Sequence, residues 1–582
     1  MIALLALSIR DIQYTTDPSG DSPYVGSSVS VSGVITAVLP DLRGFYVQEG
    51  TGPWSGIFVY AGVSMPSVER GDSVVVSGTV QEYRNNTEIV LSYVSVVGTG
   101  TLPPPLVITL PEVAESLEGV LVEVEGRVAD AWLNRRGEYL LVRDGATVKA
   151  LNRDTLRYFP FVGDTLRLRG VLEQYDDAYR VVPRDDDDVI PIALRLYSPF
   201  FNRSTDTTVS RIVKNYGNDT LSFVVASFLA KARYNADVWI YNLSSQTITD
   251  ALIDAHARGV KVRVIYESEN DNYYMDQLRD AGIPTLSDAS RSDYGYMHMK
   301  ALVIDNRDAD TDNDLVLVGS YNFTVYADTL QVNNFTAIRS SNVSQAFLTE
   351  FNEMWGGSGD YPNPAEARFG VEKTANTPNY FPAESMGVWF PPADTAEEAF
   401  RRFILATSRQ IHFGINAFTH DEIRDAYRTL HNAGRYVFGL FDYEDWNSPY
   451  SESQTMRTWG PPTYVYPYLA SYTFHDKLAI RDMRAVEFGS ANWTYNGFTR
   501  SDEVVVIIWS PYLADQFLQY LAARWREATG DSLPLGSYEV VAHPQDCSVG
   551  PLYDVAGRRV EHPKRGVYFR RCGTGFQRVV VR

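Results

Sequence analysis

The stretches His298–Asp305, HMKALVID, and His475–Asp482, HDKLAIRD, decide the fold of this 582-residue chain. A glycine-serine-x-asparagine segment follows each of them, at Gly319–Asn322 and at Gly489–Asn492. The step from His298 to His475 is close in length to the step between two glycines that end predicted helices, Gly259 and Gly434. Matched motifs at a nearly constant offset indicate an internal duplication.

The surroundings of the two motifs repeat as well. Residues 248–259 (ITDALIDAHARG) and 423–434 (IRDAYRTLHNAG) place apolar side chains at helical spacing and end in glycine. Apolar stretches with strand composition flank each predicted helix, and this alternation is typical of an α/β fold. We therefore predict a duplicated α-β-α sandwich, with one half in residues 191–375 and the other in 376–532.

The two motifs carry side chains suited to phosphate chemistry. Alternation along a strand places His298 beside Lys300, and His475 beside Lys477. An ammonium can bind a phosphate oxygen, and the glycine-serine-x-asparagine segment adds further donors to the same oxyanion. One histidine could then attack phosphorus while the other protonates the leaving oxygen. A chance surface pair could explain one copy, but two matched copies argue against that alternative.

This double His-x-Lys-x4-Asp signature resembles that of the phospholipase D superfamily over about residues 195–530. The resemblance implies hydrolysis of a phosphodiester through a covalent phosphohistidine, with no cofactor required for catalysis. It implies that His298 is the nucleophile and His475 the general acid, although the sequence does not fix this order. By the same resemblance, the phosphate ligands would be Lys300, Lys477, Asn322 and Asn492, the supporting hydroxyls Ser320 and Ser490, and the structural aspartates Asp305 and Asp482.

The two halves differ in one polar residue. Fourteen positions after Gly489 stands Glu503, an acid that in the superfamily often orients a histidine, whereas fourteen positions after Gly319 stands Asn333. We expect both to belong to the site, Glu503 in catalysis and Asn333 in substrate binding. The sequence leaves open which histidine each one supports.

An acidic insert follows the first motif, with carboxylates at Asp308, Asp310, Asp312 and Asp314. Carboxylates at every second position resemble calcium-binding loops, but the glycine and closing glutamate of an EF-hand are absent. The favoured interpretation is a solvated acidic hairpin, and the alternative is a structural Ca²⁺ site.

A second repeat lies before residue 191, between two segments rich in strand signals. Within it, residues 71–78 (GDSVVVSG) recur as residues 163–170 (GDTLRLRG). We predict two small all-β barrels, at 25–104 and 105–190, which resemble OB-fold domains attached to secreted nucleases and phosphoesterases. Residues 1–24 suggest either a truncated signal peptide or a plain first strand. The run Arg184–Asp188, RDDDD, is interpreted as a solvated linker.

The second barrel has an unusual charge distribution. Most of the basic residues in 1–188 lie between Arg135 and Arg184. Interleaved aromatics suggest a platform for single-stranded nucleic acid, and the alternative is that these rings form the barrel core. The aromatics are Trp132, Tyr139, Tyr158, Phe159, Phe161 and Tyr175.

Residues 533–582 carry a net positive charge and several short strand patterns, typical of a small β-sandwich. The segment resembles the C-terminal sorting domains of type IX secretion substrates, and the alternative is an ordinary β domain. The resemblance implies a secreted or cell-surface protein that contacts the secretion machinery. It also implies a disulfide between Cys547 and Cys572.

The formal net charge of -20 excludes a broadly basic polyanion binder, and no apolar run approaches the length of a membrane-spanning helix. The leading hypothesis is a secreted, metal-independent nuclease that acts on single- or double-stranded DNA or RNA. The alternatives are a phospholipase D that hydrolyses or transfers phospholipid head groups, and a binding module on an inactive scaffold. Since both motifs lie in one chain, we expect a monomer.

Overall fold

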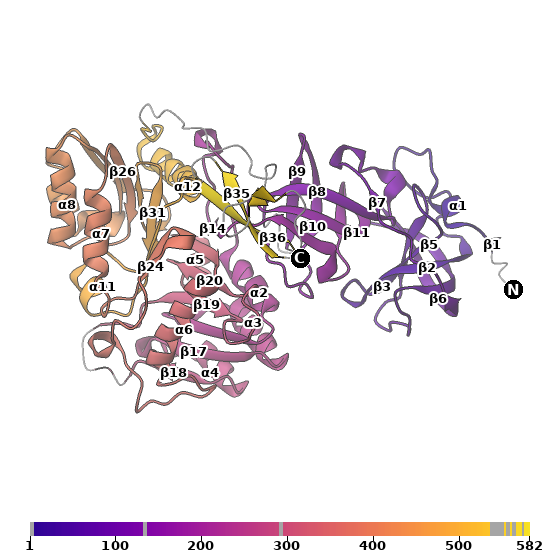
Figure 1. Ribbon diagram of the computed structural model, residues 1–582, viewed down its shortest axis with the longest axis horizontal. Helices are drawn as coiled ribbons and strands as arrows, with labels where there is room; N and C mark the ends of the chain where they lie inside the picture. Colours follow the sequence, from indigo (N-terminus) through magenta and orange to yellow (C-terminus); the bar gives the residue numbers. More distant parts are fainter. Residues whose placement is uncertain are drawn as a thin grey trace. The chain divides into compact units, whose positions relative to one another are not determined.

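The computed structural model describes residues 5–131, 137–289, 291 and 295–535, together with four strands after residue 551. The chain divides into two compact units, Met1–Ser532 and Leu533–Arg582. The first unit contains two β-barrels and two α/β halves (Figure 1). In the described residues, no helix has both the length and the apolar character needed to cross a membrane.

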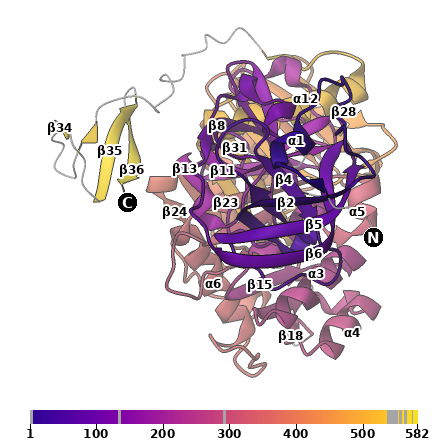
Figure 2. The same cartoon turned by 90° about the vertical axis from the view of Figure 1, so that its right-hand side faces the viewer.

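The first barrel closes five strands in the order β2-β3-β4-β6-β5, with β5 pairing back onto β2 (Figure 2). All neighbours are antiparallel except β4 and β6. The short strand β1 runs parallel to β2, and the helix α1 buries Ile9 and Ile12 against the barrel core. The described part of 1–24 therefore includes a first strand. The elements are β1 (Leu5–Ala6), α1 (Ile9–Gln13), β2 (Ser28–Leu39), β3 (Gly44–Gln48), β4 (Gly56–Tyr60), β5 (Asp72–Tyr83) and β6 (Asn86–Thr99).

The second barrel repeats this strand order as β8-β9-β10-β12-β11, with β11 closing onto β8 and β10 parallel to β12. Two further strands, β7 and β13, extend its sheet. The elements are β7 (Leu106–Val107), β8 (Leu121–Asp130), β9 (Glu138–Arg143), β10 (Ala146–Leu151), β11 (Thr165–Tyr175), β12 (Ala178–Val182) and β13 (Val189–Ala193).

The second barrel shares a continuous apolar core with the first α/β half. Lys231, at the end of helix α2, donates hydrogen bonds to Asn152 and to the Arg153 carbonyl, and Arg339 pairs with Asp164. The predicted linker Arg184–Asp188 is not simply solvated, because Asp188 is buried and forms an ion pair with Arg184 at 2.8 Å. Pairing with a neighbouring guanidinium is what allows this carboxylate to be buried.

The first α/β half has a seven-stranded sheet in the order β14-β23-β20-β19-β15-β17-β18. Apolar side chains of α2, α3 and α4 join the core on one face, while Trp239 of β15 packs against Phe347 and Phe351 of α6 on the other. The strands are β14 (Tyr197–Phe201), β15 (Asn235–Ile240), β17 (Lys261–Tyr266), β18 (Thr285–Ser287), β19 (Lys300–Ile304), β20 (Leu315–Gly319) and β23 (Asn334–Arg339). The helices are α2 (Leu221–Lys231), α3 (Gln246–Ala257), α4 (Tyr273–Asp280), α5 (Val325–Leu330) and α6 (Ser341–Trp355).

The second half repeats this order as β25-β32-β31-β30-β26-β27-β28, with β24 added at one edge. The strands are β24 (Tyr380–Phe381), β25 (Met386–Trp389), β26 (Gln410–Ile415), β27 (Tyr436–Asp442), β28 (Thr463–Tyr468), β30 (Lys477–Arg481), β31 (Ala485–Gly489) and β32 (Val505–Ile508). The helices are α7 (Ala396–Leu405), α8 (Asp421–Asn432), α9 (Tyr443–Asn447), α10 (Ser453–Met456), α11 (Tyr495–Thr499) and α12 (Pro511–Thr529).

The two predicted helices are confirmed as α3 and α8, and each ends before a glycine in the left-handed region, Gly259 and Gly434. The two halves meet along α12, where the Phe517 ring packs against Phe201 of the first half and Phe488 of the second. One helix therefore belongs to the cores of both halves.

In the second unit, the described strands form one antiparallel sheet in the order β34-β33-β35-β36. They are β33 (Leu552–Tyr553), β34 (Arg559–Val560), β35 (Gly566–Cys572) and β36 (Gly575–Val581). Cys547 lies outside the described residues, as does any second layer of the predicted sandwich.

Candidate active site

Both His-x-Lys motifs lie where a central strand of their sheet ends. Lys300 begins β19 opposite Ile240, the last residue of β15, and Lys477 begins β30 opposite Ile415, the last residue of β26. Each histidine stands two positions before its strand. The carboxyl ends of parallel strands are where α/β sheets commonly place ligands, so this position suits a reaction site.

The backbone before each strand binds to the other half of the molecule. The His298 amide donates to the Asp502 carbonyl at 2.9 Å, and the His475 amide donates to the Val332 carbonyl at 3.1 Å. The second contact continues a short parallel pairing of β22 (Gln331–Val332) with β29 (Thr473–Phe474). The two motifs are therefore held together by matching contacts across the interface.

The side chains cross the interface in the same way. His298 Nδ1 lies 2.7 Å from Oε1 of Glu503, and His475 Nδ1 lies 2.9 Å from Oδ1 of Asn333. The partner of each histidine thus comes from the other half. Because both partner atoms are acceptors, Nδ1 carries the proton in each ring and Nε2 is left for chemistry.

The two serines support these partners. Ser490 donates to the second carboxylate oxygen of Glu503 at 2.5 Å, and Ser320 donates to Asn333 at 3.1 Å. Ser320 also lies 2.6 Å from Asp476, a buried carboxylate that accepts from the Tyr520 hydroxyl and from Asn334. Asp476 was not expected at the site. Its signal in the sequence is the middle residue of the His-x-Lys motif, which is Met299 in the first half and Asp476 in the second.

Both lysines are buried beside the histidines. Each Nζ donates to the carbonyl of its own motif histidine, and Lys300 Nζ lies 4.5 Å from the ring centroid of Tyr241. Burial lowers the pKa of Lys477 to about 8, and burial lowers the pKa of Lys300 well below its usual range while Glu503 opposes that shift. Burial thus disfavours the charged form of both lysines, and a bound anion would stabilise that form.

Burial and the two lysine charges hold the pKa of both His298 and His475 well below the ordinary value. Burial raises the pKa of Glu503 to about 7, although both lysines oppose this. The backbone of the other half's serine opposes the lowering of each histidine pKa, Ser490 for His298 and Ser320 for His475. The His298 side chain is 13% exposed, so its free edge can meet a substrate.

The two asparagines lie three residues after the glycines that end β20 and β31. In the described residues, Oδ1 of Asn322 and Oδ1 of Asn492 are buried without a hydrogen-bond partner. The group that either side chain could donate to a phosphate oxygen is its Nδ2–H. The preceding glycines permit close strand contact: a Cβ on Gly319 would lie 2.5 Å from the Asn334 carbonyl oxygen, and one on Gly489 would lie 2.1 Å from that of Val504.

The motif aspartates accept hydrogen bonds from the backbone just before the central strand of each half. Asp305 accepts from the amides of Arg233 and Tyr234, ahead of β15, while Asp482 accepts from those of Ser408 and Arg409, ahead of β26. Both lie at the far ends of the motif strands from the histidines. Neither is placed to touch a phosphate held at Lys300 and Lys477.

The acidic insert uses its carboxylates locally. Asp308 accepts from the Asp310 amide, Asp310 from the Asp312 amide, and Asp310 also pairs with Arg157 at 3.3 Å. Asp314 is buried, and burial raises its pKa to about 7. In the described part of the chain, these four carboxylates do not converge on a common point, so the geometry favours the hairpin over the calcium site.

Half of the rings predicted to form a nucleic-acid platform on the second barrel lie inside the barrel instead. Tyr139, Phe159 and Phe161 are buried in its core, which confirms the alternative for these rings. Every described basic residue between 137 and 184 forms an ion pair, which leaves no free basic groove in this part of the chain. Trp132, Arg135 and Arg136 lie outside the described residues.

Comparisons with known proteins agree with this geometry. Residues 225–355 and 400–525 match the family model described as cardiolipin synthase, PLD-like domain. A mitochondrial cardiolipin hydrolase of Chlamydomonas reinhardtii is 29% identical over 133 residues, which cover 22% of this chain and 54% of the relative. A phospholipase D of Rickettsia prowazekii (strain Madrid E) is 32% identical over 127 residues, covering 21% and 55%.

The chain thus spans about half the length of these curated relatives. Among solved structures, NucT from Helicobacter pylori is 22% identical, with a TM-score of 0.23, over 25% of this chain and 96% of that protein. Both matched stretches of the family model lie in the α/β halves, one in each. Both halves of the duplicated α/β unit are therefore similar to the PLD-like domain of that family model.

Proposed function

We propose that the protein is a metal-independent phosphodiesterase that hydrolyses nucleic acid through a phosphohistidine at His298. The observation that carries the proposal is the crossed pair of histidines, His298 on Glu503 and His475 on Asn333, each with a buried lysine beside it.

The carboxylate partner of His298 supports its role as the nucleophile. Nε2 of neutral His298 attacks phosphorus, the P–N bond forms and the P–O bond to the leaving group breaks. The phosphorylated imidazole is positively charged, and the Glu503 carboxylate at Nδ1 stabilises that charge. His475 has only a neutral amide at Nδ1, so the corresponding adduct there would lack a counter-charge.

His475 gives its proton to the leaving oxygen and then accepts one from water, which attacks phosphorus and releases His298. In the free protein the lysine charges disfavour protonated His475. A bound phosphodiester anion offsets the charges of Lys300 and Lys477, so substrate binding raises the fraction of His475 that carries the proton.

Exposed tyrosines close to the motifs favour nucleic acid as the substrate. Tyr296 and Tyr472 precede the two histidines, while Tyr326 and Tyr495 follow the two asparagines. Their exposed fractions are 40%, 38%, 51% and 60%, so part of each side chain can reach a base. Arg203 lies over the Tyr472 ring and His420 stacks on Tyr495, so those two rings offer at most one free face. In the second barrel, by contrast, three of the predicted stacking rings are buried.

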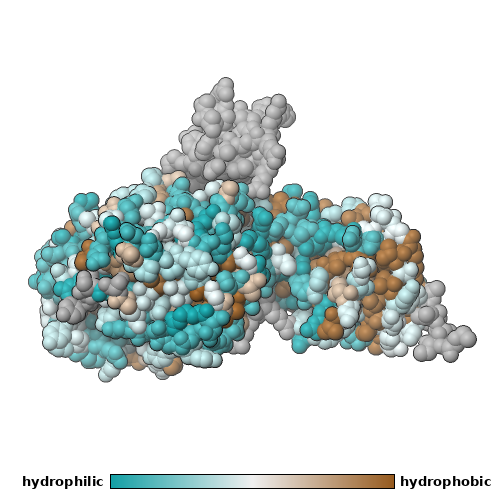
Figure 3. Space-filling model, turned by 90° about the horizontal axis from the view of Figure 1, so that it is seen from below, coloured by the Kyte–Doolittle hydropathy of each residue, from teal (hydrophilic) through white to brown (hydrophobic). Residues whose placement is uncertain are grey.

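Phospholipid head-group hydrolysis is the second candidate, supported by the names of the relatives. In the view of Figure 3, apolar surface gathers over the first barrel, while the α/β halves are mostly hydrophilic. Exposed Tyr93, Val96 and Val97 on β6 contribute apolar side chains to that barrel. This apolar surface belongs to a different part of the chain from the histidines.

The two barrels and residues 533–582 are the parts of the chain outside the duplicated α/β unit, and we propose a role for each. Closed five-stranded barrels of identical strand order support an OB-fold assignment for both. We infer export from the resemblance of residues 533–582 to sorting domains. Deletion of that segment should leave the protein inside its cell of origin, whereas unchanged export would rule this role out.

The test incubates the purified chain with plasmid, single-stranded DNA, RNA and phosphatidylcholine vesicles in excess EDTA. We expect cleavage of a nucleic acid that is lost in His298→Ala and in His475→Ala. Hydrolysis of the phosphatidylcholine vesicles alone would show that phospholipid is the substrate instead. Complete loss of activity in EDTA without a fall in Tm would contradict the metal-free route. Because the body is acidic, activity on DNA should fall only weakly with added salt.

A further inference from the structure

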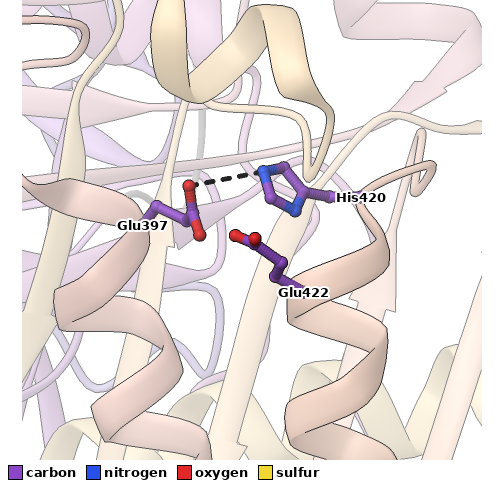
Figure 4. Close-up of side chains that lie close together, drawn as sticks. All are labelled: Glu397, His420 and Glu422. Carbon is purple, nitrogen blue, oxygen red and sulfur yellow. Dashed lines mark ion pairs between the residues drawn. The ribbon is translucent and has the colours of Figure 1, made fainter.

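A second group of potential ligands lies where helices α7 and α8 begin. Glu397 is the second residue of α7, His420 is the N-cap of α8, and Glu422 is the second residue of α8. One ligand atom from each residue lies within 4.8 Å of the other two (Figure 4). Across the described residues this is the only such trio, and it shares no residue with the catalytic site.

The His420 ring points at both carboxylates (Figure 4). Its side chain is only 6% exposed, and neither ring nitrogen has a hydrogen-bond partner. Nε2 lies 3.5 Å from Glu397, beyond ordinary hydrogen-bond length. A buried imidazole without partners costs free energy, and an ion placed between it and the carboxylates would remove part of that cost.

The two carboxylates face one another as well (Figure 4). Like charges at this range repel unless a cation or a shared proton lies between them. Arg401, one turn along α7, is the positive side chain whose charge acts on the trio. Arg424 on α8 is already engaged by Asp421, Asp425 and Glu452.

We infer that Glu397, His420 and Glu422 bind one divalent transition-metal ion, with Zn²⁺ the best fit. One imidazole nitrogen with two carboxylate oxygens is a ligand set suited to zinc, whereas calcium and magnesium prefer oxygen ligands alone. Glu422 is exposed, so water can complete the coordination.

The ion would brace the segment that carries Asn492. Thr419, next to His420, donates to the Trp493 carbonyl at 3.0 Å, and Trp493 donates to the Ala417 carbonyl at 3.0 Å. The His420 ring also packs against Phe498 of α11. The site therefore ties α7 and α8 to the chain that follows the catalytic asparagine, without touching the substrate.

The test titrates ZnCl2 into the EDTA-dialysed full chain by calorimetry, with CaCl2 and MgCl2 in parallel. We expect one zinc ion per chain at this site and a rise in Tm with zinc. Glu397→Gln and Glu422→Gln should each lower the zinc affinity at least tenfold. The matched control is Glu398→Gln, which removes the same charge from a half-exposed neighbour paired with Arg402 and should leave zinc binding unchanged.

Three outcomes would overturn the assignment. Equal zinc binding in the wild type, Glu397→Gln and Glu422→Gln would place the ion elsewhere, and loss in His298→Ala instead would identify the catalytic histidines as its ligands. An equal loss of zinc affinity in Glu398→Gln would show that the loss of surface charge, and not of a zinc ligand, causes the effect. No zinc-dependent change in heat or Tm would mean that the two carboxylates share a proton.

Discussion

Glu503 of the second half accepts a hydrogen bond from Nδ1 of His298 of the first half at 2.7 Å. The equivalent contact, from His475 to Asn333, ends on a neutral amide. Two motifs with the same spacing therefore have partners of different charge. We expect this difference to decide which histidine is phosphorylated.

Replacing Glu503 with Gln keeps the hydrogen-bonding shape but removes the charge. We expect kcat to fall by about 10–100-fold, as for other residues that orient a catalytic imidazole, with a smaller effect on KM. Single-turnover and steady-state kinetics would measure this. Ser490→Ala, which removes only the hydroxyl that supports Glu503, is the control, and an equal or greater loss there would argue that geometry rather than charge matters.

The two histidines should respond differently to the leaving group. With bis(p-nitrophenyl) phosphate, whose leaving group needs little protonation, His475→Ala should release a burst of p-nitrophenol and accumulate phosphorylated protein. On an oligonucleotide the same variant should lose about 10²–10⁴-fold in rate. His298→Ala should fail on both substrates, and a burst from His298→Ala would reverse the assignment.

The pH profile of kcat/KM should be bell-shaped. Glu503 acts as a carboxylate and its pKa is raised to about 7, so activity falls as the pH drops through that value. Lys477 acts as an ammonium and its pKa is lowered to about 8, so activity falls as the pH rises past it. Because Glu503 and Lys477 interact, the apparent pKa values of the two limbs of the profile belong to the site as a whole and not to single residues. Glu503→Gln should lose the acid limb only; an unchanged acid limb would assign it to another group.

Gly489→Ala should destabilise the second half, because its Cβ would lie 2.1 Å from the Val504 carbonyl oxygen within the β31–β32 pairing. We expect a cost of about 1–3 kcal/mol in the free energy of unfolding, as for other overpacked positions, together with reduced activity. Gly359→Ala is the control, since its nearest atom is 3.7 Å away. Urea unfolding of both variants measures the difference, and equal stabilities would contradict the steric argument.

A buried ion network supports the segment beside Glu503. Lys373 contacts Glu350 at 2.5 Å and Asp502 at 3.1 Å, and none of these side chains is more than 1% exposed. Lys373→Met should cost about 3–5 kcal/mol, because it leaves the buried Glu350 carboxylate without its cation, while Asp502 keeps its ion pair with Arg291. Lys261→Met, which breaks an exposed pair with Asp360, should cost less than about 1 kcal/mol. Equal costs for the two variants would contradict the argument that burial makes the Lys373 contacts the more important ones.

Local periodicity was enough to predict the α/β repeat, the helices α3 and α8, and the strands that begin at Lys300 and Lys477. The matching position after each motif glycine pointed to Glu503 and Asn333 for the same reason, because the two halves repeat the same turn. These features depend on short stretches of chain, where residue spacing and geometry are directly linked.

Features made by distant segments could not be predicted in this way. Nothing near His298 indicates that its partner is Glu503, which lies far along the chain and on the other half. The rings of the second barrel had a composition that suits both a core and a binding face, and only the closed barrel shows Tyr139 and Phe161 inside. The trio of Glu397, His420 and Glu422 has no motif spacing, since two helix starts bring it together.

The crossed contacts also bear on why both halves occur in one polypeptide. If the site were built from two identical chains, symmetry would place the same residue beside both histidines, and any substitution would appear twice. Joining the halves removes that constraint, so a carboxylate can stand at one position and an amide at the other. The covalent link therefore allows the two histidines to have different roles, which two identical copies of a single half could not provide.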